Sequence, residues 1–116
     1  MRGTLLKGKE ILAVDDEKDI LEVLDEELAE YEVVLDTATS YKEACRKLAS
    51  YTYDIAIFDI MGVQGFDLLE MAVSKGIQVV MLTAHGLSVE ALKRSIELGA
   101  RAYLPKDQLA SLPAFL

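Results

Sequence analysis

Apolar residues follow two alternating patterns along the chain. Short runs, most of them continuously apolar, are typical of strands that are buried on both faces of a sheet. They predict strands over residues 11–14, 32–36, 54–58, 77–82 and 101–104. The run at 32–36 mixes polar and apolar residues, which favours a place at the edge of the sheet.

Between these runs, apolar residues recur every three or four positions, which predicts amphipathic helices. In residues 18–30, leucines fall on one face and acidic residues on the other. Ser40 and Glu43 form a capping box at the start of the second helix. The other helices are predicted over residues 66–74, from Ser88 to Gly99 with Val89, Leu92 and Ile96 along it, and from Asp107 until Pro113 ends it.

Five strands that alternate with five helices predict an α/β fold, with a doubly wound parallel sheet covered by helices on both faces. The length of 116 residues and the apolar fraction of 52% suit one domain over residues 1–116. Right-handed crossovers bring the carboxyl ends of all strands to one edge of the sheet. Ligand sites in such sheets lie at that edge, so we expect the residues that follow the strands to meet there.

Acidic, hydroxyl and ammonium groups follow four of the strands. Asp15 and Asp16 follow the first, Asp59 the third, Thr83 the fourth and Lys106 the fifth. Crowded carboxylates resist ionisation unless a cation is bound, and Mg²⁺ prefers oxygen ligands. Asp59 is suited to attack a phosphoryl group and form an acyl phosphate. The Thr83 hydroxyl and the Lys106 ammonium are suited to bind the phosphoryl oxygens.

Each feature alone has a simpler explanation. An aspartate after a strand is often a helix cap, a threonine there is often a turn residue, and a lysine near a chain end is usually solvated. The set is specific because all four features occur in one order at one predicted edge.

The net charge and the cysteine content limit which partners the chain can bind and indicate its cellular compartment. The net charge of −8 disfavours direct binding to nucleic acid or to an anionic membrane, and it suits protein partners that carry positive charge. Cys45 is the single cysteine, so no internal disulfide is possible, and it is interpreted as a small core residue. No apolar run is long enough to span a bilayer, and the start does not look like a secretory signal. Together these features predict a cytoplasmic protein.

The chain resembles the receiver domains of response regulators in two-component signalling, the CheY-like superfamily, over nearly its whole length. The stretches that carry the resemblance are ILAVDDE at 11–17, FDIM at 58–61, VMLTA at 80–84 and GARAYLPK at 99–106. The resemblance implies a flavodoxin-like sheet in strand order 2-1-3-4-5. It also implies Mg²⁺-dependent phosphoryl transfer to Asp59 from a sensor histidine kinase or a phosphotransfer protein, in a signalling domain rather than a turnover enzyme.

The resemblance further implies how the ion is held. Asp16 would be a direct ligand and Asp15 would act mostly through water. Asp59 and the backbone carbonyl of Met61 would complete the protein's share.

The resemblance also implies a switch. Thr83 would move toward the phosphoryl group and Tyr103 would turn inward. The surface of the fourth helix, fifth strand and fifth helix would then change its preference for a downstream protein, an output domain or a second copy of the chain.

The sequence departs from the family in two places. No proline follows Asp59, and the loop after it is about two residues short, so Gly62 and Gly65 are expected to supply its turns. Asp107 rather than proline follows Lys106, so we expect a trans bond or strain there. Met61 and His85 occupy the positions expected to tune the phosphoryl lifetime; Met61 would hinder the hydrolytic water, and His85 is more simply a loop residue.

Two other functions need residues that this chain lacks, and a third stays open. A flavin- or nucleotide-binding domain needs a glycine-rich loop after the first strand, where this chain has acidic residues. An aspartate-nucleophile phosphatase usually has a second aspartate two residues past the nucleophile, where this chain has Met61. A receiver-like adaptor that never takes phosphate stays open because of the short loop.

Overall fold

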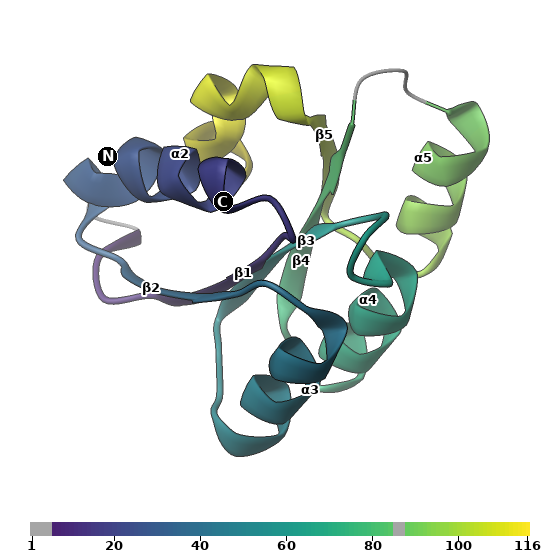
Figure 1. Cartoon of the computed structure of the whole chain (residues 1–116), viewed down its shortest axis with the longest axis horizontal. Helices are drawn as coiled ribbons and strands as arrows, with labels where there is room; N and C mark the ends of the chain where they lie inside the picture. Colours follow the sequence, from purple (N-terminus) through teal and green to yellow (C-terminus); the bar gives the residue numbers. More distant parts are fainter. Residues whose placement is uncertain (1–5, 85–87) are drawn as a thin grey trace.

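The computed structural model describes residues 6–84 and 88–116, and it contains one parallel sheet of five strands. The strand order β2-β1-β3-β4-β5 confirms the predicted flavodoxin-like topology (Figure 1). The strands are β1 (Glu10–Val14), β2 (Val34–Ala38), β3 (Ile55–Asp59), β4 (Gln78–Thr83) and β5 (Ala102–Pro105).

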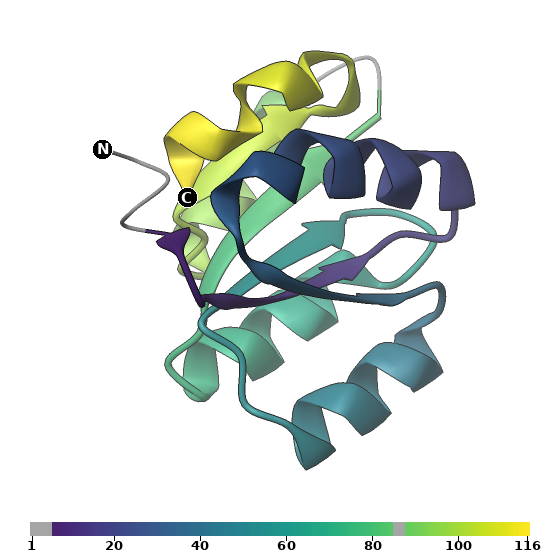
Figure 2. The ribbon, with the colours of Figure 1, turned by 90° about the vertical axis from the view of Figure 1, so that its left-hand side faces the viewer.

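Helices cover both faces of this sheet. The helices are α2 (Lys18–Leu28), α3 (Tyr41–Ser50), α4 (Gly65–Ser74) and α5 (Val89–Glu97), and the 3₁₀ segments are η1 (Ala29–Tyr31) and η2 (Lys106–Phe115), as far as the described residues show. Figures 1 and 2 show α2 and η2 together on one face and α3 and α4 on the other. Two layers of helix around one sheet are the arrangement that a doubly wound fold requires.

Each face of the sheet has its own apolar core. Consecutive strand residues point to opposite faces. In β1, Ile11 therefore packs with Leu24 and Leu112 under α2 and η2, whereas Leu12 packs with Leu48 under α3. All five residues of β3 are buried, which explains why this strand is continuously apolar up to Asp59.

The observed boundaries correct several predicted ones. The first helix ends at Leu28 and a 3₁₀ turn follows, after which Glu32 adopts a left-handed φ of 56°. This turn delays β2 to Val34–Ala38 rather than residues 32–36. The last helix begins at Lys106 rather than Asp107 and is 3₁₀, with a kink at Gln108.

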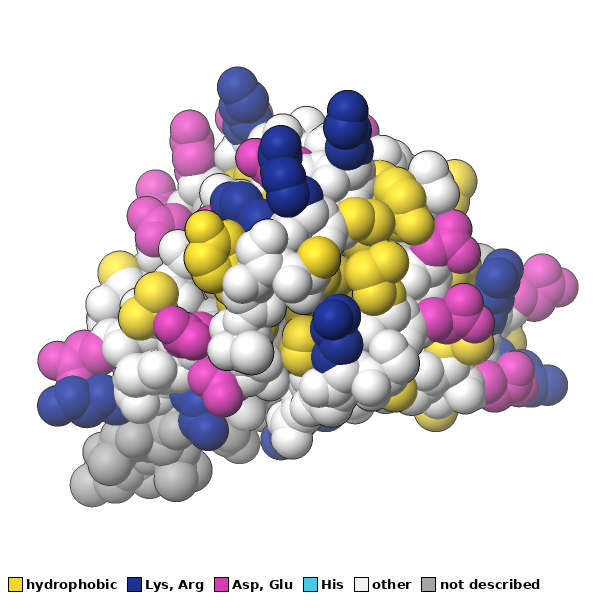
Figure 3. Space-filling model, turned by 90° about the horizontal axis from the view of Figure 1, so that it is seen from below, with side chains coloured by type: hydrophobic (Ala, Val, Ile, Leu, Met, Phe, Trp, Pro, Cys, Tyr) yellow, Lys and Arg dark blue, Asp and Glu magenta, His cyan; other side chains and the backbone are white. Residues whose placement is uncertain are grey.

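Helix α5 presents its apolar stripe to solvent. Val89, Leu92 and Ile96 are 78%, 41% and 51% exposed, whereas Ser95 is fully buried. The Ser95 hydroxyl is satisfied because it donates to the Ala91 carbonyl at 2.8 Å. Figure 3 views the molecule from below, where hydrophobic side chains lie at the surface among charged ones. The stripe is therefore available to a partner.

Within residues 6–84 and 88–116, no helix has the length and apolar character needed to cross a membrane.

Candidate functional site

Lys106 joins two buried carboxylates at the carboxyl edge of the sheet. Its Nζ lies 2.9 Å from Oδ2 of Asp15 and 3.1 Å from Oδ1 of Asp59. Asp15 is fully buried and Asp59 is 4% exposed. Asp59 ends β3, Asp15 directly follows β1, and Lys106 directly follows β5. The parallel topology thus brings three predicted site residues from distant parts of the chain to one point.

Glu17 is a further partner of Lys106 that sequence reasoning missed. Its Oε2 lies 3.4 Å from Lys106 Nζ, on the exposed side of the site. Its backbone N–H donates to Oδ1 of Asp15 at 2.8 Å, which fixes the orientation of that carboxylate. This bond lies in the turn before α2, whose N-cap is Glu17, so Asp15 does not cap the helix and its carboxylate pairs with Lys106. The place of Glu17 in the same short motif as Asp15 was the available signal.

Asp16 completes an acidic cluster with Asp15 and Asp59. Each residue offers a carboxylate oxygen, and these oxygens lie within 4.8 Å of one another. Unlike its two neighbours, Asp16 is exposed, and its carboxylate lies against Gly62. A donor set made only of oxygens suits a hard divalent cation such as Mg²⁺. The residues present therefore fit the ion that the sequence predicts.

Burial and like charge control the ionisation of this cluster. The pKa of Asp59 is raised to about 6, because burial and, to a smaller extent, the charge of Asp15 together outweigh the opposing effect of Lys106. Burial also raises the pKa of Asp15. For Lys106, burial lowers the pKa, but the bonds to Asp15 and Asp59 outweigh burial and raise the pKa overall. Two carboxylates that resist ionisation beside a firmly charged ammonium form a site that a bound cation would stabilise.

Thr83 and Tyr103 lie on β4 and β5. The residue before Thr83, Leu82, pairs with Asp59 in the sheet, so Thr83 is at the same edge as the acidic cluster. The Thr83 hydroxyl donates to the Ala84 carbonyl at 3.3 Å. Tyr103 packs against the core on the α3 and α4 side. Its hydroxyl oxygen is buried and has no hydrogen-bond partner among the residues that the structure describes.

Comparison with known proteins identifies the family. Residues 11–114 match the family described as the response regulator receiver domain. This chain belongs to that family. As a receiver domain it is 36% identical over 100 residues to the transcriptional regulatory protein CusR of Escherichia coli strain K12, across 83% of this chain and 44% of CusR. The chain therefore spans less than half the length of this relative.

Solved structures agree with the family and the fold. A response regulator receiver domain protein from Clostridium thermocellum is 26% identical, with a TM-score of 0.79 over 92% of this chain and 90% of that chain. A CheY-like receiver domain protein from Methanospirillum hungatei JF-1 is 28% identical, with a TM-score of 0.77 over 93% of each chain.

The loop between β3 and α4 of this receiver turns back at once on the end of β3. The N–H of Ile60 donates to the Leu82 carbonyl at 3.0 Å, so pairing with β4 continues one residue past Asp59. The N–H of Val63 then donates to the Met61 carbonyl, and the N–H of Gly65 donates to the Ile60 carbonyl at 3.0 Å. Met61 itself is 73% exposed. The loop is thus ordered by backbone hydrogen bonds without a proline.

Two glycines in this loop serve different purposes. Gly62 has a φ of 58°, in the left-handed region that favours glycine, so the prediction that it supplies a turn is confirmed. Gly65 is needed for space, because a Cβ there would lie 2.2 Å from the backbone oxygen of Asp59. Gln64 between them also adopts a left-handed φ of 55°, which no sequence signal indicated.

The remaining predicted features have simple outcomes. The described chain contains no cis peptide bond, so the bond after Lys106 is trans. Cys45 is partly buried and packs against the edge of the core on the α3 side, which agrees with its interpretation as a small core residue. His85 lies outside the described residues.

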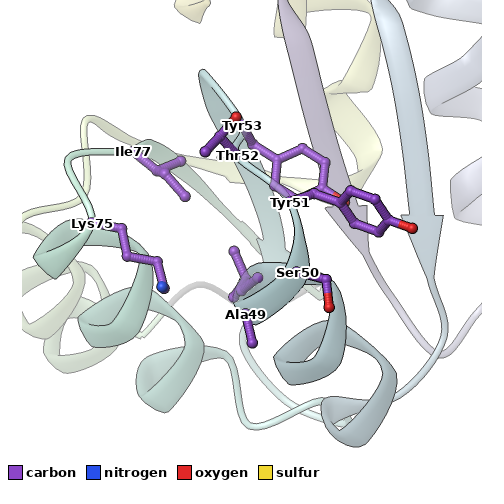
Figure 4. Close-up of a pocket in the computed structure, with 8 residues that line it drawn as sticks. Ala49, Ser50, Tyr51, Thr52, Tyr53, Lys75 and Ile77 are labelled. Carbon is purple, nitrogen blue, oxygen red and sulfur yellow. The ribbon is translucent and has the colours of Figure 1, made fainter.

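One surface cavity lies away from the acidic cluster. This cavity of about 200 Å³ lies between the end of α3 and the turn after α4, with Lys75 and Tyr51 on opposite sides (Figure 4). It is at the amino edge of the sheet, and its lining residues supply no carboxylate. This cavity therefore contributes no ligand to the acidic cluster.

Proposed function

We propose that this receiver domain accepts a phosphoryl group on Asp59 from a phosphohistidine of a sensor kinase or phosphotransfer protein, in a Mg²⁺-dependent reaction. The observation that supports the proposal most is the position of Lys106, whose ammonium lies 3.1 Å from Asp59 and 2.9 Å from Asp15. A lysine with a merely solvated role would not be held between two buried carboxylates.

In the proposed reaction, an ionised oxygen of Asp59 attacks the phosphorus atom. The O–P bond forms as the P–N bond to the donor imidazole breaks, and the imidazole keeps that electron pair and takes up a proton. A pKa of about 6 leaves Asp59 mostly ionised at pH 7.5, so the nucleophile is available. Lys106 is placed to pair with a phosphoryl oxygen as charge develops there.

Four groups would hold Mg²⁺. Asp16 and Asp59 would bind it directly, Asp15 would act mostly through water, and the Met61 carbonyl would complete the set. When bound, the ion neutralises charge between the carboxylates and the incoming phosphoryl oxygens.

Thr83 and Tyr103 are the proposed switch pair. The Thr83 hydroxyl, which now donates to the Ala84 carbonyl, would turn toward a phosphoryl oxygen. This contact exists only in the phosphorylated state, so it can shift the equilibrium between two conformations. The Tyr103 hydroxyl is buried and lacks a partner in the described part of the chain, so a hydrogen bond gained on rearrangement would favour the new state.

The surface that responds would be made by α5, β5 and η2. The exposed apolar side chains Val89, Leu92 and Ile96 suit a protein partner, either an output protein or domain or a second copy of the chain after phosphorylation. We propose no direct contact of this domain with nucleic acid or membrane, since its net charge is −8. The cytoplasm, where kinases of this kind act on their regulators, is the proposed location.

Intact-protein mass spectrometry tests the proposal. The parent, incubated with acetyl phosphate and Mg²⁺, should gain the mass of one phosphoryl group. Asp59→Asn with Mg²⁺, and the parent in EDTA, should gain none. A parent that gains no phosphoryl group and does not bind fluoroberyllate would contradict the proposal and favour a phosphate-independent adaptor.

A further inference from the structure

We propose that Gly62 is a positioning residue for the metal ligand Asp16, a role that rests on the Mg²⁺ site proposed above. A Cβ built on Gly62 would lie 2.6 Å from Oδ2 and 2.8 Å from Oδ1 of Asp16. Non-bonded carbon and oxygen atoms do not approach this closely, so the Asp16 carboxylate occupies space that exists only because residue 62 has no side chain.

Two separate demands fall on residue 62. Its φ of 58° favours glycine, and the Asp16 carboxylate excludes a side chain. Gly76 meets only the first demand: its φ is 78°, and a Cβ there would have no atom within 4 Å. The two glycines therefore separate the backbone cost of alanine from the cost of displacing Asp16.

The displacement should affect metal binding more than folding. Asp16 is exposed, and its carboxylate is the far end of a flexible side chain, so it can swing away at little cost to the fold. Its partners in the cluster, Asp15 and Asp59, are buried and held by Lys106, so they cannot follow it. Once Asp16 moves, its oxygen no longer lies within the 4.8 Å span that the three carboxylates now share.

The loop after Asp59 places residue 62 beside two of the proposed ligands. Gly62 directly follows Met61, whose carbonyl is in the proposed ligand set and accepts the N–H of Val63. Residue 62 thus adjoins one proposed ligand through the backbone and touches another, Asp16, through space. A glycine at this position lets the loop come close enough for both to face one ion.

Isothermal titration with Mg²⁺ tests the inference on the parent, Gly62→Ala and Gly76→Ala. We expect Gly62→Ala to weaken Mg²⁺ binding at least about tenfold, the scale on which groups that orient ligands change metal affinity. Gly76→Ala should bind within about twofold of the parent. Without metal, the thermal midpoints of the two variants should fall by similar amounts. Both substitutions place alanine in a left-handed backbone conformation, which strains it to a similar extent. Unchanged Mg²⁺ affinity in Gly62→Ala would overturn the inference.

The Asp16→Ala background shows whether Gly62 acts through Asp16. There, adding Gly62→Ala should cost no further Mg²⁺ affinity, because the group it displaces is already gone. A further loss as large as in the parent would place the effect in the backbone and overturn the assignment. A parent that binds no Mg²⁺ would instead refute the proposed metal-dependent function itself, so the two failures are distinguishable.

Discussion

The ammonium nitrogen of Lys106 lies 3.1 Å from Oδ1 of Asp59, and both side chains are almost fully removed from water. The two residues are distant in sequence, since Asp59 ends the central strand β3 and Lys106 begins η2 after the edge strand β5. A buried charge is costly unless it is paired. This relationship therefore makes the stability of the fold depend on the same groups that we propose for phosphoryl transfer.

Removal of the ammonium should destabilise the metal-free protein. In Lys106→Met, Asp15 and Asp59 lose their shared cation while they stay buried, so the free energy of unfolding at pH 7.5 should fall by roughly 3 kcal/mol. Urea denaturation in EDTA measures this. Lys7→Met is the matched control, because its ion pair with Glu32 has side chains 68% and 65% exposed and should be worth well under about 1 kcal/mol. Equal losses in both variants would argue against a special role for the buried pair.

Metal-free stability should rise as the pH falls from about 7 toward about 4. The pKa of Asp59 is about 6 in the folded state against 3.8 for an ordinary aspartate, so in this range the folded state binds a proton that the unfolded state does not. Protonation of Asp59 thus adds stability that is lost again as the pH rises through about 6. The raised pKa of Asp15 acts in the same direction.

Asp59→Asn isolates this effect. The variant should be more stable than the parent at pH 7.5 in EDTA, by about 1–3 kcal/mol, because the neutral amide removes a buried charge that resists ionisation. The two proteins should converge in stability near pH 4, where Asp59 of the parent is protonated. A constant difference between them from pH 4 to pH 8 would show that Asp59 does not titrate in this range.

The sheet and the meeting of its site residues could be predicted because both follow from periodicity and topology. Continuous apolar runs identify buried strands. In a parallel sheet the carboxyl ends of the strands lie at one edge, so Asp15, Asp59 and Lys106 must meet there. The outward stripe of α5 could not be predicted in this way. A helical period shows that Val89, Leu92 and Ile96 share a face, but it does not say whether that face or the one with Ser95 packs on the sheet.

The contacts that the loop residues make could not be predicted from the sequence. The positions of Gly62 and Gly65 indicate turns, but not that one lies under Asp16 and the other against the backbone of Asp59. The left-handed Gln64 shows the same limit, because a non-glycine residue adopts that conformation only when its neighbours impose it. Such contacts depend on how β3, α4 and the loop pack in three dimensions.

Gly65→Ala should be much more damaging than Gly76→Ala. A Cβ at residue 65 would lie 2.2 Å from the Asp59 backbone oxygen and 2.7 Å from the Ile60 Cα, and neither backbone atom can move without disturbing the end of β3. We expect a loss of more than about 2 kcal/mol in the free energy of unfolding, against about 1 kcal/mol for Gly76→Ala, which meets only the backbone penalty. Denaturant unfolding of the two variants measures the contrast. Similar losses would mean that the loop relaxes away from Asp59 at little cost.

The side chain of Met61 should set how long Asp59 stays phosphorylated, provided that the proposed phosphoryl transfer occurs. Met61 is 73% exposed and lies two residues past Asp59, so its bulk is free to lie over the phosphoryl group and hinder the water that hydrolyses it. Met61→Asn should therefore lose the phosphoryl group faster, by roughly tenfold, which corresponds to about 1.4 kcal/mol in the barrier. Met61→Leu, which keeps the apolar bulk, should resemble the parent. The decay of the phosphorylated mass after removal of acetyl phosphate gives the three rates, and an asparagine variant that decays no faster than the parent would refute the shielding role. Because the side chain is exposed, unfolding free energies should be alike in all three proteins, so a change in lifetime would report on access of water to Asp59 and not on loss of the fold.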